Sequence, residues 1–333
     1  YRKLQKGSPT IYKGQRRRKS PPYRSGAVEP ELVAAQLNWE KTALVNLPDP
    51  PAKGLVKHFN MEKSDQTFRP EILRKQPNEG RQAGKPDLQP ALLGVAASFD
   101  GDAVIESKGG INFDQTDAFS YGAWVNLTSG SPACVISKND DVINLRGFDL
   151  MIRKGKAVAH LIHKWNSSAI QVMTKTSIPR NQWQHIMVTY DGSGKAAGVK
   201  IYRDGEPQPL DIRHDSLQGT IRTEQSLRIG RRSTSAAFVG WIDEVGIYDR
   251  ELASDEVRRL VASQLVRALV GIPVEKRTPD QQKMLREFFL AKHAPPRLQQ
   301  AHRIVIKFRR QVREIESGVP TSMVMQEMPE PRD

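Results

Sequence analysis

The sequence is poor in cysteine, in long apolar runs and in hydrophobic and aromatic residues, and each shortage argues against a class of protein. It has 333 residues and a single cysteine, Cys134, which excludes internal disulfides, cysteine-rich zinc sites and a C-x-x-C-H haem attachment. No apolar run approaches the roughly 18 residues that span a bilayer, so no membrane span is predicted. Hydrophobic residues make up 38% and aromatic residues 7%, which favours polar arms around one core over two compact domains.

Positive charge is in excess, with 51 Lys and Arg against 37 Asp and Glu, but it is unevenly placed. Residues 1–30 carry a net charge of +8, residues 88–262 a net charge of zero, and residues 263–333 a net charge of +5. A nucleic-acid-binding domain concentrates bases on its folded surface. Because the centre of this chain is neutral, we expect no nucleic-acid partner and interpret the basic N-terminal arm as a linker.

The pattern of apolar residues changes along the chain. Residues 29–47 follow a loose helical period that three prolines end. From Gly54 to about Tyr248, short alternating runs are separated by turn residues, which is typical of an all-β sandwich. The dipeptide Asp204-Gly205 follows one such run and predicts a tight hairpin. The absence of helices of 10–15 residues between these runs argues against a doubly wound α/β fold.

Helical signals return after the β-rich centre. Ser254 is a candidate N-cap, and Thr278 is a stronger one because Pro279 and Gln281 follow it. In the last helix, apolar residues recur at alternating spacings of three and four, which is a heptad pattern. This pattern predicts either a helical hairpin within the chain or dimerisation. Its members are Leu298, Ala301, Val305, Phe308, Val312 and Ile315.

The centre of the chain resembles a known family over about 205 residues, Gly54 to Leu260. The most specific string is Trp183…His185-x-x-Val188-x-Tyr190-Asp191-Gly192, followed by Tyr202-x-Asp204-Gly205. Strings in the expected order around it are ALLGVAASFDGDAVI (91–105), FSYGAWVNL (119–127) and FVGWIDEVGIYDRELASDEVRRL (238–260). This order is similar to that of laminin-G-like domains. The resemblance implies a mainly β, antiparallel jelly roll of the concanavalin A-like lectin/glucanase superfamily, here with α-helical connectors at both ends.

The flanking segments resemble a second pattern. Residues 276–296 and 319–333 are similar to connectors in large secreted proteins of planctomycete bacteria, in which a cytochrome-c-like domain and two further domains surround a laminin-G-like insert. The resemblance implies that the chain is a fragment or a split gene product of an exported protein, although it has no signal peptide of its own. The haem motif of those proteins is missing, so their redox role is not transferred to this chain and no haem is expected in it.

These observations divide the chain into five parts. We expect a basic disordered linker (1–28), a helical connector (29–53), the jelly-roll domain (54–262), a helical hairpin or short coiled coil (263–318), and an extended tail (319–333) that leads to a missing domain.

Calcium is the candidate cofactor. Laminin-G-like domains often hold one Ca²⁺ with carboxylates and backbone carbonyls, because this cation takes six to eight oxygen ligands. The resemblance implies Asp100, Asp102 and Asp243 as the ligands. The alternative interpretation is that residues 98–102 (SFDGD) form only a turn, which their Asp-Gly composition already explains.

Carbohydrate binding needs an aromatic platform with polar neighbours. Trp165 is the one tryptophan in a polar setting, flanked by His163, Lys164 and Asn166, and we predict that these four residues contact a glycan at the rim of the sandwich. The alternative is an aromatic side chain docked on a neighbouring domain. His160 and His163 are three apart on an expected strand, so they face opposite sides and cannot chelate a metal together.

The sequence predicts a non-catalytic binding or scaffolding module whose partner is a glycan or a neighbouring domain. Two enzyme alternatives remain: a glycoside hydrolase of the same fold, or part of a haem-dependent redox protein. Glycosidases need two carboxyl groups that face each other across the substrate. The nearest string, Asp243-Glu244, places adjacent acids on opposite faces of a strand, so no catalytic residue is assigned.

Overall fold

The computed structural model describes residues 28–61, 86–129 and 132–318. The basic linker predicted at 1–27 and the tail predicted at 319–333 lie outside these residues. The chain divides into two compact units, one formed by residues 40–289 and the other by the chain on either side of that range. We describe each unit by itself.

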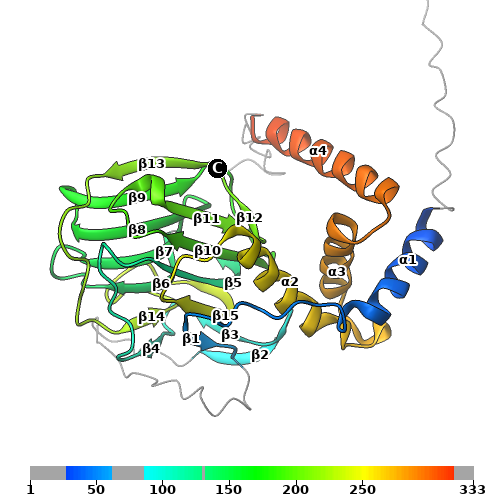
Figure 1. Cartoon of the computed structure of the whole chain (residues 1–333), viewed down its shortest axis with the longest axis horizontal. Coiled ribbons are helices and arrows are strands. Elements are labelled where there is room, and N and C mark those ends of the chain that lie inside the picture. Colours follow the sequence, from blue (N-terminus) through cyan, green and yellow to red (C-terminus); the bar gives the residue numbers. More distant parts are fainter. Residues whose placement is uncertain (1–27, 62–85, 130–131, 319–333) are drawn as a thin grey trace, which may run out of the picture. The chain divides into compact units, whose positions relative to one another are not determined.

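Residues 40–289 contain two antiparallel sheets that pack face to face (Figure 1). One sheet has the order β12-β11-β10-β5-β15-β3-β2, and β1 also pairs with β15. Its strands are β1 (Leu55–Phe59), β2 (Asp87–Ala91), β3 (Gly94–Asp100), β5 (Phe119–Ser129), β10 (Gln184–Tyr190), β11 (Val199–Arg203), β12 (Glu206–Pro207) and β15 (Val239–Tyr248).

The second sheet has seven strands in the order β13-β9-β8-β7-β6-β14-β4. Its strands are β4 (Ile105–Ser107), β6 (Ala133–Asn139), β7 (Gly147–Arg153), β8 (Lys156–Lys164), β9 (Ser168–Thr174), β13 (Leu210–Asp215) and β14 (Leu227–Ile229). The predicted antiparallel sandwich is confirmed. The predicted hairpin is formed as well: Asp204 and Gly205 have φ values of 52° and 81° and connect β11 to β12.

The core lies between the sheets, where alternate side chains of each strand meet. Its aromatic centre is made by Phe119, Tyr121, Phe148 and Tyr190, all buried. Phe119 lies 5.1 Å from the ring of Phe148 in the facing sheet and 5.6 Å from that of Tyr190 on the neighbouring strand. Residues that alternate with these core positions therefore point to the outer faces of the sandwich.

Helix α2 (Ser254–Val270) covers the outer face of the eight-stranded sheet (Figure 1). Its Val257 and Leu260 are buried with Met187 and Tyr202 of the sheet. The residue that caps the helix is Ala253, not the expected Ser254, whose hydroxyl instead lies 3.0 Å from that of Tyr202. The helix also runs through the domain boundary expected at residue 262.

Helix α3 (Pro279–Lys292) begins as its sequence predicts, after the short 3₁₀ helix η2 (Val274–Lys276). The Thr278 N–H donates to Oε1 of Gln281 at 2.9 Å, and the Gln281 N–H donates to Oγ1 of Thr278 at 3.3 Å. This reciprocal pair is a capping box. Just before it, the Arg277 guanidinium donates to both carboxylate oxygens of Glu40, and both side chains are buried.

Helix α1 spans Val28–Ala43 and helix α4 spans Pro296–Gly318. Val305, Phe308 and Val312 of the heptad pattern are 44%, 60% and 51% exposed. Leu298, at the start of the same pattern, is buried. The helical hairpin and dimerisation therefore both stay predictions. Among the described helices, none is long and apolar enough to cross a membrane.

Candidate functional site

Four loops gather at one end of the seven-stranded sheet because its strands alternate in direction. The β6–β7 and β8–β9 turns lie at the same end, and the β14 pairing brings residues 223–226 to the end of β6. We call this end the loop rim and define it as residues 108–112, 140–146, 165–167 and 216–226 (Figure 1). Each of these four loops contains exposed residues, among them Lys108, Val142, Asn166 and Glu224.

Trp165 lies in the β8–β9 turn and is partly exposed. Its backbone N–H donates to the carbonyl oxygen of Asn144 at 3.0 Å, which ties the turn to the neighbouring loop. The centroid of its ring is 5.3 Å from the imidazole of His160 and 5.2 Å from that of His214. Two imidazoles therefore hold one indole in place at the edge of the sheet.

The outer face of the sheet beneath Trp165 carries a polar row. Asp149, His160 and Gln171 lie directly opposite one another on β7, β8 and β9, and all three are buried. Nδ1 of His160 lies 2.7 Å from Oδ1 of Asp149, and its Nε2 lies 2.9 Å from Nε2 of Gln171. Both ring nitrogens of His160 are thus engaged, which fixes the imidazole against which Trp165 packs.

Arg232 completes this polar row, and its Nε donates to Oδ2 of Asp149 at 3.0 Å. Burial raises the pKa of Asp149, but the charges of Arg232 and His160 and their hydrogen bonds outweigh burial, so the pKa lies below its ordinary value. The carboxylate is therefore ionised and balanced by the guanidinium.

The structure separates the four residues predicted to contact a glycan. Lys164 and Asn166 are exposed on either side of Trp165, and Asn166 adopts a left-handed conformation (φ 68°) in the turn. His163 faces elsewhere: its Nδ1 donates to the carbonyl oxygen of Thr220 at 2.8 Å. His160 and His163 have different partners, as expected from their spacing.

Sequence reasoning missed His160 and His214 as neighbours of Trp165. His214 lies opposite Gln171 on β13, so it extends the row of Asp149, His160 and Gln171 across the sheet. These residues are far apart in sequence, and only the strand register brings them together. The one local signal for the contact between His160 and Trp165 was their separation of five residues, with His160 on the expected strand and Trp165 just after it.

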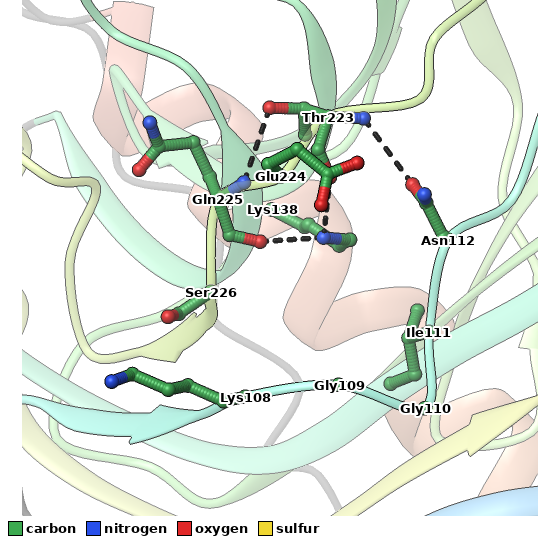
Figure 2. Close-up of a pocket in the computed structure, with 10 residues that line it drawn as sticks. All are labelled: Lys108, Gly109, Gly110, Ile111, Asn112, Lys138, Thr223, Glu224, Gln225 and Ser226. Carbon is green, nitrogen blue, oxygen red and sulfur yellow. Dashed lines mark hydrogen bonds between the residues drawn. The ribbon is translucent and has the colours of Figure 1, made fainter.

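A cavity of about 460 Å³ opens at the rim beside β6 (Figure 2). The ammonium group of Lys138 forms part of its wall and donates to the carbonyl oxygens of Thr223 (2.8 Å) and Gln225 (2.5 Å). Opposite these carbonyls, Asn112 accepts a hydrogen bond from the Thr223 N–H at 3.2 Å. The complete lining is Lys108, Gly109, Gly110, Ile111, Asn112, Lys138 and residues 223–226.

The three carboxylates predicted to bind calcium are not brought together. Oδ1 of Asp100 accepts from the N–H groups of Asp102 and Ala103 at 2.9 and 3.0 Å, which is the turn that its composition suggested. Asp100 pairs with Val239, four residues from Asp243 along β15, a separation of roughly 13 Å at 3.3 Å per residue. In the described ranges, no three His, Cys, Asp or Glu side chains are placed to hold a metal ion.

Asp243 and Glu244 lie away from the loop rim. Asp243 is buried opposite Trp124, on the face that α2 covers. Oε2 of Glu244 lies 2.8 Å from Nε2 of His58 and also accepts from Nε2 of Gln264 at 2.8 Å. These two acids are therefore engaged in structural contacts and do not face each other across a cleft.

Cys134 is buried in a small apolar cluster with Met151 and Val158. Burial raises the pKa of its thiol well above the ordinary value, and the negative charge of Asp149 adds to the effect. The thiol is therefore protonated and inaccessible, and Cys134 packs as a small hydrophobic residue.

Residues 99–258 match the laminin G family model that is described as the concanavalin A-like lectin/glucanases superfamily. The match runs from the end of β3 to the first turn of α2 and confirms the laminin-G-like resemblance seen in the centre of the sequence.

Solved structures with a similar fold include binding domains of bacterial toxins. The binding domain of Paraclostridial mosquitocidal protein 1 has 14% identity and a TM-score of 0.47, with 64% of this chain and 52% of that chain covered. The binding domain of botulinum neurotoxin serotype G has 15% identity and a TM-score of 0.46, with 63% and 51% covered. This chain thus spans about half the length of either toxin domain.

A third similar structure is domain 4 of an extracellular arabinanase from Geobacillus stearothermophilus, in complex with arabinotriose. It has 21% identity and a TM-score of 0.43, and the match covers 62% of this chain and 98% of that domain.

Proposed function

We propose that this chain is a non-catalytic binding module that recognises a carbohydrate at the loop rim, with Trp165 as the stacking platform. The observation that carries the proposal is the fixed position of a partly exposed indole between His160 and His214. Exposed polar side chains, Lys164 and Asn166, flank it and supply hydrogen-bonding groups of both kinds.

The platform is organised before any ligand binds. His160 is held by Asp149 and Gln171, and the Trp165 backbone by Asn144, so the indole loses little conformational freedom on binding. A rigid site binds more tightly because fewer side chains have to be ordered. An aromatic face also offers a large apolar area at a low entropy cost, which suits the apolar face of a sugar ring.

A second candidate function, docking of a neighbouring domain, is favoured by the loop next to Trp165. Val142 and Ile143 at its tip are 84% and 56% exposed. Oδ1 of Asp140 accepts from both of their N–H groups, at 3.0 and 2.9 Å, so the loop holds two apolar side chains out into solvent. In either case the chain would act within an exported multidomain protein, as its connectors suggest.

A glycan array separates the two functions. We expect the parent chain to bind at least one glycan, Trp165→Ala to weaken that binding about tenfold or more, and Trp165→Phe to retain most of it. Val142→Ser/Ile143→Ser serves as the matched control on the neighbouring loop and should leave glycan affinity unchanged. A parent chain that binds no glycan overturns carbohydrate recognition and leaves the docking function.

A further inference from the structure

The cavity of the loop rim contains a cation that lacks a carboxylate partner. Lys138 is 6% exposed, and its ammonium group uses two of its three N–H donors on backbone carbonyls. In the described part of the chain it forms no ion pair of 4 Å or less. Buried ammonium groups are almost always paired with an anion, because burial without one is costly.

The groups around Lys138 offset its charge only in part: burial lowers the pKa of Lys138, the charge of Glu224 raises it and that of Arg228 lowers it, with a lower pKa as the result. Lys108 also lines the cavity. Arg228 is bonded through its Nε to Oε1 of Glu106 at 2.6 Å, so that carboxylate is already used. Nη1 of Arg228 is buried and has no hydrogen-bond partner among the described residues. Glu224 is the one acid of the lining, and it is exposed.

The size and the remaining groups of the cavity suit a sugar ring (Figure 2). Its volume of about 460 Å³ lies within the range of roughly 300–1,000 Å³ that small-molecule sites occupy. Asn112 uses its carbonyl oxygen on Thr223, which leaves its NH₂ group for a ligand hydroxyl, and Ser226 offers a hydroxyl group. A Cβ atom placed on Gly109 would have no neighbouring atom within 4 Å. Because glycine has no side chain, a ligand can approach the backbone closely at this position.

We propose that this cavity binds the anionic group of an acidic sugar, a uronate carboxylate, against the third N–H donor of Lys138. The inference rests on the proposed carbohydrate-binding function and specifies its ligand class: an acidic glycan whose charged unit enters the cavity. A sulfate ester presents the same anionic chemistry, so the experiment includes one.

The test compares sugars that carry a carboxylate, a neutral ester or a sulfate. Isothermal titration calorimetry is carried out with tetragalacturonate, its fully methyl-esterified neutral form, and a galactose 6-sulfate oligosaccharide. We expect the free acid to bind at least tenfold more tightly than the ester, and Lys138→Met to bring the two affinities together. Glu224→Gln, which removes the acid of the lining, should strengthen binding of the free acid and leave the ester unchanged.

Several results would overturn the inference. The inference is wrong if the free acid and the ester bind with equal affinity, or if the preference for the acid survives in Lys138→Met. It is also wrong if the sulfated sugar binds more tightly than the free acid. Should Lys138→Met fail to fold, Glu224→Gln and Lys108→Met decide the outcome through the acid-to-ester ratio. Binding that depends on Trp165 but not on ligand charge refutes the inference and leaves the proposed function intact, whereas absence of binding to any sugar refutes both.

Discussion

His185 should make this protein sensitive to acid. The imidazole is buried on the outer face of β10, 5.6 Å from the ring of Trp124, and neither ring nitrogen has a hydrogen-bond partner among the described residues. Burial lowers the pKa of His185 from 6.5 to about 3. The folded protein therefore keeps this group neutral over a pH range in which the unfolded chain protonates it.

The sign and size of the effect follow from this difference in pKa. Above pH 6.5 the imidazole is neutral in both states and has no influence on the pH dependence of stability. Between pH 6.5 and about 3 only the unfolded state takes up the proton, so the free energy of unfolding falls as the pH falls. At 1.36 kcal/mol per pH unit, the loss is roughly 2.7 kcal/mol at pH 4.5 and on the order of 5 kcal/mol near pH 3.

The variant His185→Phe isolates this contribution because it keeps a ring against Trp124 and removes the proton. Urea unfolding of both proteins, followed by circular dichroism at pH 7.5, 5.5 and 4.5, gives the difference in free energy at each pH. The nearby carboxyl of Asp204, whose pKa burial raises to about 6, is present in both proteins and cancels in the difference. We expect the variant to gain about 2–3 kcal/mol on the parent between pH 7.5 and 4.5. Parallel pH profiles would refute the reasoning.

The remaining predictions concern the supports of the fold. Arg277→Leu leaves the Glu40 carboxylate buried without its partner, so it should lower the free energy of unfolding by about 3–5 kcal/mol in urea titrations. Replacing both residues by leucine should recover part of this loss. Thr278→Ala removes the cap of α3 and should cost about 1 kcal/mol in the same assay. Since Asp100 and Asp243 lie apart, EDTA should leave the Tm unchanged; a fall in Tm that Ca²⁺ reverses would contradict the register argument.

The fold was predictable because local patterns and global architecture agree. Alternation of apolar residues in 119–127 and 185–190 is the signature of strands buried on one face, and both segments are adjacent strands of the sandwich. The hairpin at Asp204-Gly205 and the capping box at Thr278 depend on a few neighbouring residues, and both are confirmed. Position in the heptad pattern of α4 was less informative, because periodicity shows which residues share a face and not what covers it.

The candidate site was predictable only in part. Trp165 was identified from its polar neighbours, but the contacts that hold it come from His160 and His214, which strand register alone places beside it. Lys138 gave no signal in the sequence, since its burial depends on the loop that contains Thr223 folding over the end of β6. Long-range register and loop closure are the two properties that a single sequence does not reveal.

Two turns of the loop rim, residues 140–146 and 165–167, are built separately from the core, and this has a consequence for how such a domain diversifies. They connect paired strands without contributing side chains to the cluster between the sheets; Asn144 and Leu145, both at φ 57°, are examples. Changes in length or composition at these turns therefore leave the scaffold standing. Selection can alter what is recognised at that edge while the free energy that keeps the domain folded stays almost constant, so relatives that share the sandwich need not share a ligand.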